Sequence, residues 1–356
     1  MFFWRWPEEF RNAVRDGFPN WFLSVPLPSR RPQNICRDMA TTRLVVTKLE
    51  DVLTKGYIQS PNYDILSWIS FFPVQKGLDD ARMVYNGTSN GLNDTLWAPW
   101  FPLPTLESVE LGLVPGTTLG DLDIGEMFLN FQLHVSVRKY TGVDLRKYRQ
   151  FFQDPSACPD IAVWTRACMG LGPSPYFCLR TLLLCLETIQ NLQNPHYLEN
   201  LFRWDKVILN LPGMTSFDTT YPWVYKWDDI RQCVAAAIKS YMDDVRLMCF
   251  GNEYMRKLLR FVASQLQYSG IQDAARKRTN PHHGTVPLAG TISGTTSGEV
   301  TRTVSQERWD KAGFLIQSLI IALGLPPAVC SNLWIELRES TGGWMWSCGH
   351  LGTGIE

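Results

Sequence analysis

Two apolar runs separated by a short polar segment form the clearest pattern along the chain. Residues 233–238 are apolar, residues 245–250 are largely apolar, and the tetrapeptide Tyr241-Met242-Asp243-Asp244 lies between them. This pattern predicts a buried β-hairpin that carries two adjacent carboxylates at its tip. Because uncompensated buried charge is costly, the tip also predicts contact with a divalent cation.

Adjacent aspartates do not establish a site by themselves, since the chain contains three such pairs. Asp79-Asp80 lies in the polar stretch 76–82, and Asp228-Asp229 precedes a predicted helix start. Asp243-Asp244 interrupts apolar residues on both sides. This context favours a metal-binding role for the third pair over a solvated surface.

A second acidic cluster lies far upstream in the segment 121–128, which contains Asp121, Asp123 and Glu126. Apolar and polar residues alternate over the following residues 129–134, and this alternation predicts a strand that has the acidic cluster at one end. A two-cation site needs carboxylates from separate strands, with the ions about 4 Å apart. The two clusters together therefore predict phosphoryl-transfer chemistry with Mg2+, or with Mn2+ as the alternative ion.

Helical periodicity appears in two later segments. Residues 255, 258, 259, 262 and 266 are all apolar and share one helical face, which predicts a helix that ends at Gly270. A second helix is predicted from about residue 305 to 323, stopped by Gly324 and Pro326. The Gly/Ser/Thr-rich stretch 290–297 between them is compatible with a flexible linker or a hairpin.

Composition narrows the picture only slightly. The 356 residues are 45% hydrophobic, which is enough for a substantial core divided into subdomains, and the formal net charge is zero. Zero charge is unusual for a protein that binds nucleic acid, so basic side chains would have to gather on one face. The candidate basic runs are Arg30-Arg31, Arg146-Lys147-Arg149 and Arg276-Lys277-Arg278. Such short runs are also common on ordinary solvated surfaces.

The nine cysteines include no Cys-x-x-Cys pair, which favours buried thiols in a reducing compartment over a zinc site. No run approaches the roughly 18 apolar residues of a membrane span. We therefore expect an intracellular protein, in the cytoplasm or nucleus, without a signal peptide or membrane anchor.

Three segments in order resemble motifs A, B and C of reverse transcriptases: 123–128, 169–177 and 241–244. Residues 72–77 and 82–93 resemble the fingers motifs, and 268–278 and 289–290 resemble motifs D and E, so the resemblance covers about residues 70–310. The sequence segments 91–94, 268–278 and 304–311 are most similar to those of retrotransposon enzymes of the DIRS-like, tyrosine-recombinase kind. An LTR-type relative is the alternative.

The resemblance implies an α+β right-hand polymerase fold of fingers, palm and thumb, in which helices back an antiparallel palm sheet. Residues 1–65 would be an N-terminal extension of unknown role, 66–106 fingers, and 107–300 palm with an interleaved fingers segment and an insertion near 186–230. Residues 301–356 would begin the thumb or connection, so that the chain is C-terminally truncated.

The resemblance also implies roles for the acidic residues and for one lysine. Asp123 and Asp243 would each bind both metal ions, and Asp244 would contribute less directly. Lys277 matches the motif D lysine that is proposed to protonate the leaving pyrophosphate, although Arg278 could exchange with it by one residue of register. Without the resemblance, residues 276–278 are simply a solvated basic run.

Further positions would contact the nucleotide, the primer or the template. Lys76 and Arg82 would hold the triphosphate, and Phe128 would be the steric gate that excludes a ribose 2′ hydroxyl. Gly170 would let the backbone approach the nucleotide, and Met169 replaces the glutamine of retroviral relatives. Tyr241 and Met242 would face the primer end, while Ser174 and Pro175 would cap and start the next helix. The simpler readings are a core aromatic at Phe128 and an ordinary loop at 172–175.

The predicted function is RNA-directed DNA polymerase activity, with an RNA template, a DNA or RNA primer and deoxynucleoside triphosphates as partners. The oligomeric state is left open by the sequence. One rival is an inactive element remnant that binds nucleic acid or acts as a scaffold, which zero net charge and Met169 favour. The other rival is an RNA-templated RNA polymerase, which a bulky Phe128 gate disfavours.

Overall fold

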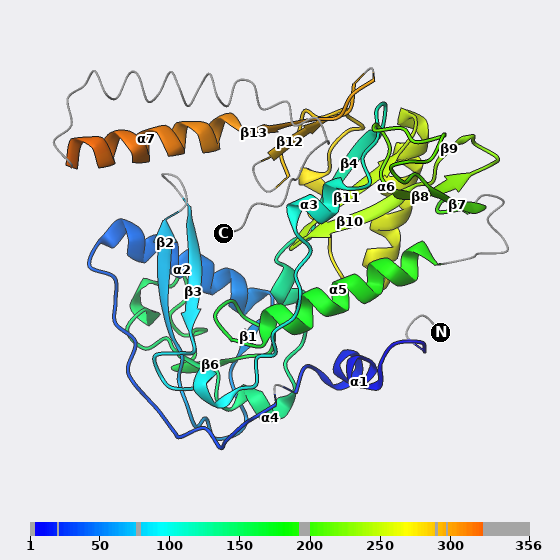
Figure 1. Ribbon diagram of the computed structural model, residues 1–356. Helices are drawn as coiled ribbons and strands as arrows, with labels where there is room; N and C mark the ends of the chain where they lie inside the picture. The colour runs from blue at the N-terminus through cyan, green and yellow to red at the C-terminus, as the bar shows by residue number, and fades with distance from the viewer. Residues whose placement is uncertain are drawn as a thin grey trace. The chain divides into compact units, whose positions relative to one another are not determined.

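The computed structural model describes residues 4–19, 21–75, 80–191, 200–288, 291–296 and 298–322. The chain divides into two compact units, each built from separated segments. Unit 1 comprises Met1–Pro102, Glu126–Cys185 and Gly270–Gln272, and unit 2 comprises Leu103–Gly125, Leu186–Ser269 and Asp273–Glu356. Figure 1 labels the helices and strands of both.

Unit 1 combines helices with two small antiparallel sheets. Its sheets are the three-stranded β1-β6-β5 and the hairpin β2-β3. The strands are β1 (Ile58–Gln59), β2 (Ser70–Gln75), β3 (Ala81–Asn86), β5 (Gly142–Asp144) and β6 (Ile161–Trp164). The helices are α1 (Glu8–Asp16), α2 (Met39–Thr54), α4 (Val135–Arg138) and α5 (Ser174–Gln190), whose last turns continue into unit 2, with the 3-10 turns η1 (Asn93–Thr95), η2 (Met127–Asn130) and η3 (Arg149–Phe151).

The core of unit 1 is aromatic. Tyr85 of β3 and Trp164 of β6 are buried and meet edge to face, with their ring centroids 4.6 Å apart. Tyr85 also lies near Phe71, which in turn packs against Tyr148 at 5.4 Å. Aromatic contacts of this kind add to the free energy of burial, and the edge-to-face pair Tyr85–Trp164 joins the two small sheets of this unit.

Unit 2 contains a different arrangement of strands and helices. Its strands are β4 (Thr118–Asp123), β7 (Lys206–Leu209), β8 (Val224–Asp228), β9 (Cys233–Val234), β10 (Ala237–Tyr241), β11 (Asp244–Cys249), β12 (Thr291–Gly294) and β13 (Thr301–Val304). Its helical segments are α3 (Leu106–Glu110), α6 (Asn252–Tyr268), η4 (Ala275–Lys277) and α7 (Gln306–Ala322).

The central sheet of unit 2 has the strand order β10-β11-β4, with both neighbouring pairs antiparallel. Helix α6 packs against β4 and β11, as Figure 1 shows. The five apolar residues that predicted this helix are all buried. The helix ends at Tyr268, two residues before the predicted end at Gly270. A Cβ atom at Gly120 would lie 2.6 Å from Met255 Sδ, so the absence of a side chain there permits the close approach of α6 to β4.

Several predicted elements are confirmed. The Asp243-Asp244 hairpin is formed by β10 and β11, and the second predicted helix corresponds to α7. The ambiguous glycine-rich stretch contributes to the antiparallel pair β12-β13, so the hairpin alternative is correct. Residues beyond 322 lie outside the described residues, and the subdivision into fingers, palm and thumb stays a prediction.

The predicted strand at 129–134 is wrong in its position. The strand beside the acidic cluster is β4, which precedes and ends in the acidic residues, whereas 127–130 form the 3-10 turn η2. The alternation is nevertheless real in burial, because Phe131 and Leu133 are buried while Gln132 is exposed. Among the described residues, this extended segment makes isolated bridges, through Leu133 to Phe18 and through Gln132 to Arg166, instead of a continuous ladder. Periodicity alone could not distinguish it from a paired strand.

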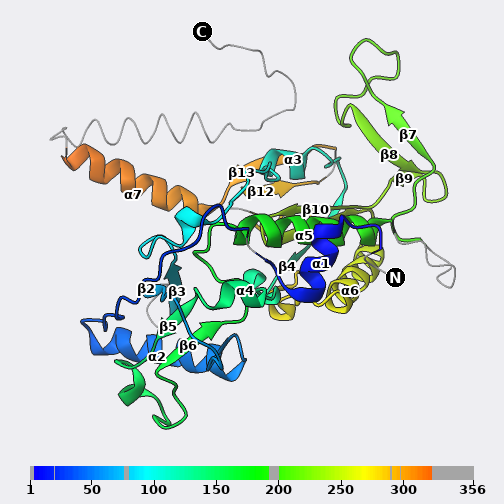
Figure 2. The same cartoon turned by 90° about the horizontal axis from the view of Figure 1, so that it is seen from below.

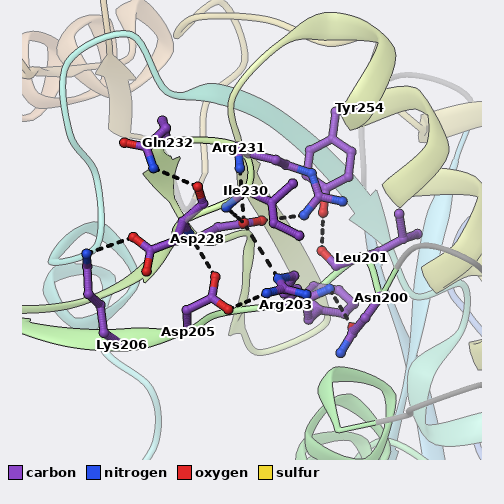
Figure 3. Close-up of polar contacts among 12 residues, drawn as sticks. Asn200, Leu201, Arg203, Asp205, Lys206, Asp228, Ile230, Arg231, Gln232 and Tyr254 are labelled. Atoms are coloured by element: carbon purple, nitrogen blue, oxygen red, sulfur yellow. Dashed lines mark hydrogen bonds and ion pairs between the residues drawn. The ribbon is translucent and has the colours of Figure 1, made fainter.

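The predicted insertion near 186–230 contains β7 and β8, which with the following β9 form a ribbon that extends away from the central sheet and α6 of unit 2 in Figure 2. Its base is held by charged groups: Arg203 pairs with Asp205, and Arg231 pairs with buried Asp228 (Figure 3). Arg231 also lies over the ring of Tyr254 of α6, 4.6 Å from its centroid.

The helix predicted after Asp228 is absent, and that prediction is corrected to a turn. Asp228 is the last residue of β8, and Oδ1 of its carboxylate accepts hydrogen bonds from the backbone N–H groups of Ile230 and Arg231. The side chain therefore closes the turn from β8 to β9, a common use of aspartate outside helices.

The prediction of buried thiols is confirmed for five of the described cysteines: Cys158, Cys168, Cys178, Cys185 and Cys249 are free and buried. Cys36 and Cys233 are only half-buried, and Cys330 and Cys348 lie outside the described residues. Burial raises the pKa of Cys158, Cys168 and Cys178. No helix among the described residues has both the length and the apolar character needed to cross a membrane.

Candidate active site

The two faces of the central sheet differ in chemistry. Side chains alternate across a strand, so Leu122 and Val245 lie on the face that α6 covers. The opposite face carries three successive cross-strand pairs: Asp123 with Asp244, Asp121 with Arg246, and Leu119 with Met248. Charge on that face therefore increases toward the carboxyl end of β4, where the two acidic clusters of the sequence meet.

The hairpin tip is a two-residue turn between the paired residues Tyr241 and Asp244. Met242 has φ +54°, a backbone region that side chains other than glycine, asparagine and aspartate seldom adopt. The carbonyl of Asp243 accepts a 2.9 Å hydrogen bond from the N–H of Ile124, which follows β4. This bond ties the turn to the end of β4, so the strained tip has a defined position beside Asp123.

Negative charge is concentrated at this end of the sheet. Asp243 is exposed in the turn, and Asp244 is half-buried. Burial, followed by the negative charges of Asp243, Asp123 and Asp121, raises the pKa of Asp244 to about 6, and Lys277 acts in the opposite direction. A cation bound at this end of the sheet would be stabilised by the same negative charges that disfavour ionisation of Asp244.

Lys277 is the positive group of the site. Its Nζ lies 2.7 Å from Asp123 Oδ2, and its side chain is 51% exposed. Asp123 and Lys277 are 154 residues apart in the chain. The structure therefore brings together Asp123, Asp244 and Lys277 as the sequence predicted, while neighbouring Arg278 instead pairs with Asp273. The register alternative at Arg278 is thus disfavoured.

The segment that carries Lys277 runs along β4. Ala274 N–H donates to the carbonyl of Asp123 (2.8 Å), and Thr279 N–H donates to the carbonyl of Asp121 (3.2 Å). Farther on, Leu119 and His282 exchange two backbone hydrogen bonds of 2.7 and 2.9 Å. We call residues 273–285 the flanking segment. Its backbone contacts fix which of its residues face the carboxylates.

A buried polar cluster lies next to the carboxylate pair on the same face. Arg246 has a side chain with 0% exposure, and its Nε donates to Asp121 Oδ1 at 2.8 Å. His282 Nε2 lies 2.9 Å from Asp121 Oδ2. Burial raises the pKa of Asp121, but hydrogen bonds from His282 and Arg246 outweigh it and hold the pKa below its ordinary value.

Sequence reasoning missed Arg246 and His282. The available signal was the interruption of the apolar run 245–250 by a single arginine, two residues after Asp244. On a strand, residues two apart share a face, so Arg246 had to lie beside the carboxylates or be paired. Asp121 has the same spacing from Asp123, which would have suggested the partner. Nothing local pointed to His282, because its contact depends on the path of the flanking segment.

The donor set fits Mg2+. Carboxylate oxygens from the two strands and the turn are the hard ligands that this ion prefers. Within the described ranges, no three His, Cys, Asp or Glu side chains are already gathered in an arrangement that could hold a metal ion. Mg2+ usually keeps several waters and binds through one or two carboxylates plus substrate phosphates, so this chemistry needs no preformed protein cage.

The remaining predicted residues belong to unit 1. Phe128 lies in η2 and is half-buried. The turn is preceded by Glu126, which has φ +48° and accepts hydrogen bonds from Lys55 and Tyr57. Arg82 is exposed on β3, opposite Val74. Lys76 lies outside the described residues.

Met169 is 37% exposed, and Gly170 is exposed with φ +110°. A Cβ atom at Gly170 would lie 1.5 Å from the carbonyl oxygen of Tyr85. The close approach that requires glycine in this structure is therefore to the backbone of β3. Its predicted approach to a nucleotide stays a prediction.

The expected cap at Ser174 is wrong in detail. Helix α5 does begin at Ser174, but the hydroxyl of this buried residue makes no hydrogen bond within the described residues. The N–H of Phe177 donates to the carbonyl of Pro173, which places Ser174 and Pro175 inside the first turn. A side chain in that position cannot act as the N-cap, which precedes the first helical residue.

No protein-family model and no curated protein matches this sequence. Solved structures of the foamy viral protease–reverse transcriptase do match. The dRH form in complex with double-stranded DNA has a TM-score of 0.57 at 16% identity, covering 82% of this chain and 40% of that chain. A second complex with double-stranded DNA has a TM-score of 0.55 at 16% identity, covering 82% and 48%.

The complex of the same viral protein with an RNA/DNA hybrid has a TM-score of 0.54 at 17% identity, covering 82% of this chain and 31% of that chain. In all three comparisons, this chain spans less than half of the viral protein. At these identities the likeness concerns the fold. The chain therefore has a mixed α/β fold like that of a reverse transcriptase.

Proposed function

We propose that this chain is an RNA-directed DNA polymerase that extends a primer 3′ hydroxyl on an RNA template, using deoxynucleoside triphosphates and Mg2+. The observation that carries the proposal is the cross-strand pairing of Asp123 with Asp244, with Asp243 in the adjoining turn. The reverse-transcriptase-like fold supports it. The viral complexes with DNA and with an RNA/DNA hybrid support nucleic acid as the partner.

The proposed chemistry divides between the ions and the protein. Bound Mg2+ would lower the pKa of the attacking hydroxyl and neutralise charge on the triphosphate. Asp123 and Asp243 would hold the ions, with Asp244 completing the set. Lys277 would hold a proton at Nζ for the leaving pyrophosphate, from its position beside Asp123.

The roles proposed for residues of unit 1 rest on the motif resemblance. Phe128 would select deoxynucleotides by steric exclusion, and Lys76 and Arg82 would bind the phosphates. Met169 and Gly170 would contact the incoming nucleotide. In unit 2, Tyr241 and Met242 would face the primer terminus, where the fixed hairpin turn would give them a constant orientation.

The direct test is primer extension on a homopolymeric RNA template with deoxynucleotides and Mg2+, comparing the wild-type chain with Asp243→Asn. We expect the substitution to reduce extension by at least about 1000-fold, because an amide removes the negative charge that an ion requires. Circular dichroism would establish that the exposed substitution leaves the fold intact. Asp229→Asn, in the β8–β9 turn, is the matched exposed control and should retain extension.

The outcomes distinguish the proposal from its rivals. A folded wild-type chain that does not extend any primer would reject polymerase activity and favour an inactive remnant. Extension with ribonucleotides in preference to deoxynucleotides would indicate an RNA polymerase instead. If Phe128 is the gate, Phe128→Val should raise ribonucleotide incorporation by about 10-fold or more while deoxynucleotide incorporation continues.

We also propose that the chain derives from a retrotransposon, of the DIRS-like kind or an LTR-type relative. The sequence segments 91–94, 268–278 and 304–311 support this assignment. The fold comparison supports the reverse-transcriptase-like architecture. The proposed element type rests on these three sequence segments alone.

A further inference from the structure

The buried cluster of Arg246, Asp121 and His282 connects three separate parts of unit 2: β11, β4 and the flanking segment. Each member is at most 9% exposed. Asp121 accepts from Arg246 through both carboxylate oxygens, at 2.8 and 3.2 Å, and its Oδ2 is also bonded to His282. A carboxylate that accepts hydrogen bonds on both oxygens has a strongly restricted orientation.

The hydrogen bonds of His282 are directional. The N–H groups of Gly284 and Thr285 both donate to Nδ1, at 3.1 and 3.3 Å. Nε2 therefore carries the hydrogen that it donates to Asp121. One ring nitrogen thus bonds to the backbone of the flanking segment, and the other bonds to the carboxylate of Asp121 on β4. These two contacts fix the register of the flanking segment against β4.

That register determines the position of Lys277. Between Asp123 and His282, the flanking segment is joined to β4 at Ala274 and at Thr279, whose hydroxyl accepts from Asp121 N–H at 2.8 Å. Lys277 lies between these two attachment points in the turn η4. A shift of the segment by one residue would move the lysine by about 3.3 Å, which is enough to break its 2.7 Å contact with Asp123.

Arg246 also links the cluster to the chain just after the flanking segment. Its Nη2 donates to the carbonyl of Val286 at 3.2 Å, just beyond the flanking segment, as well as to Asp121. Because β11 also carries Asp244, the cluster contacts both strands that hold the paired carboxylates. A buried ion pair contributes little net stability compared with apolar residues, so a role in specifying geometry is consistent with its presence there.

We propose that Arg246, Asp121 and His282 form a positioning triad that sets the register of residues 273–285 on β4 and thereby holds Lys277 beside Asp123. These residues act through Lys277 and do not touch the reacting groups. The part of this proposal that concerns catalysis rests on the proposed polymerase function. The part that concerns register is independent of it.

Amide hydrogen exchange on the full chain tests the register directly. His282→Leu removes both the donor to Asp121 and the acceptor of two backbone N–H groups, while leaving the Arg246–Asp121 pair intact. We expect the amides of Ala274, Lys277 and Thr279 to exchange at least about 10-fold faster, with α6 unchanged. Asp228→Asn is the matched control, because it disrupts a buried aspartate–arginine pair at the base of the β7-β8-β9 ribbon (Figure 3).

A second variant protects the test against misfolding. Asp121→Leu combined with Arg246→Met removes both buried charges together, which avoids leaving one unpaired. It should show the same local increase in exchange. Unchanged exchange in a folded variant, or an equal increase in Asp228→Asn, would overturn the proposal. Global unfolding of both triad variants beside a folded Asp228→Asn would also overturn it, in favour of a purely structural cluster.

Primer-extension kinetics then separate positioning from general loosening. His282→Leu should lower kcat by about 10-fold and change the nucleotide KM by less than about twofold. In a Lys277→Gln background, the same substitution should lower kcat no further, because its effect on kcat depends on the position of Lys277. A further tenfold loss in that background would contradict the proposal. If the wild type has no activity, the polymerase function fails, while the exchange result still decides the register.

Discussion

Gly170 shows at the scale of one residue how a motif position can have more than one physical cause. Its resemblance to motif B predicts contact with a nucleotide, but the structure places the backbone of Tyr85 where a Cβ atom would lie. The amide of Tyr85 also donates to the carbonyl of Met169, at 3.2 Å. The glycine is therefore required by the packing of unit 1, whatever it does for a substrate.

We expect Gly170→Ala to cost more than about 4 kcal/mol of folding free energy, enough to unfold a marginal domain, because the clash is with backbone and φ is +110°. Thermal unfolding followed by circular dichroism would measure the loss. The matched control is Gly91→Ala, where φ is +75° but no atom lies within 4 Å of the added Cβ. It should cost only about 1–2 kcal/mol. Similar melting temperatures for the two variants would disprove the packing argument.

At the scale of elements, the contact between β4 and α6 determines how closely the helix covers the sheet. The added Cβ at Gly120 would approach Met255 Sδ to 2.6 Å and Leu259 Cδ1 to 3.1 Å. Both neighbours are side-chain atoms, so they can shift, unlike the backbone atoms around Gly170. The close packing of the apolar face of α6 on β4 thus depends on the missing side chain of Gly120, the residue before Asp121.

Gly120→Ala should therefore cost about 1–3 kcal/mol through overpacking, and Met255→Ala should cost about 2–5 kcal/mol through the cavity it leaves. The double variant should be less destabilised than the sum of the two, by about 1 kcal/mol or more, since each change compensates the other. Urea unfolding of the four proteins gives the coupling. Simple additivity would mean that the two side chains do not compete for the same space.

The elements also differ in how well their sequences predicted them. The α6 pattern identified a helix because its buried residues keep helical spacing from Met255 to Leu266. The β10-β11 hairpin followed from two apolar runs around a polar tip. Residues 129–134 show alternating burial without a ladder, and the turn after Asp228 resembled a helix start. For residues 129–134 the alternation was real, but the partners of this segment lie far away in the chain. After Asp228, the carboxylate caps the backbone N–H groups of a short turn instead of those of a helix.

At the scale of the whole molecule, zero net charge is accompanied by extensive pairing of the basic runs. Arg146 pairs with Asp144, Arg149 with Asp160, and Arg278 with Asp273. Their charge is therefore largely compensated by neighbouring carboxylates. The basic runs 146–149 and 276–278 contribute less positive potential than their composition suggests.

We consequently expect a weak salt dependence for binding to an RNA/DNA hybrid. The slope of log affinity against log salt concentration should be shallower than about −4, which corresponds to few released counterions. Fluorescence anisotropy between about 50 and about 200 mM salt would measure it. Asp144→Asn should steepen the slope by about one, because it frees Arg146. A wild-type slope of about −6 or steeper would show that unpaired cations dominate the binding surface.

The sequence by itself determined the hairpin, the helix behind it and the two acidic clusters, because each is encoded by spacing within a few residues. It also identified Asp123, Asp243, Asp244 and Lys277 as one candidate site through the order of the motifs. Only the tertiary structure paired Asp123 with Asp244, placed Lys277 at Asp123, and revealed the buried triad beneath them. Those contacts join residues more than 100 positions apart, and their energies depend on burial and register, which local spacing does not contain.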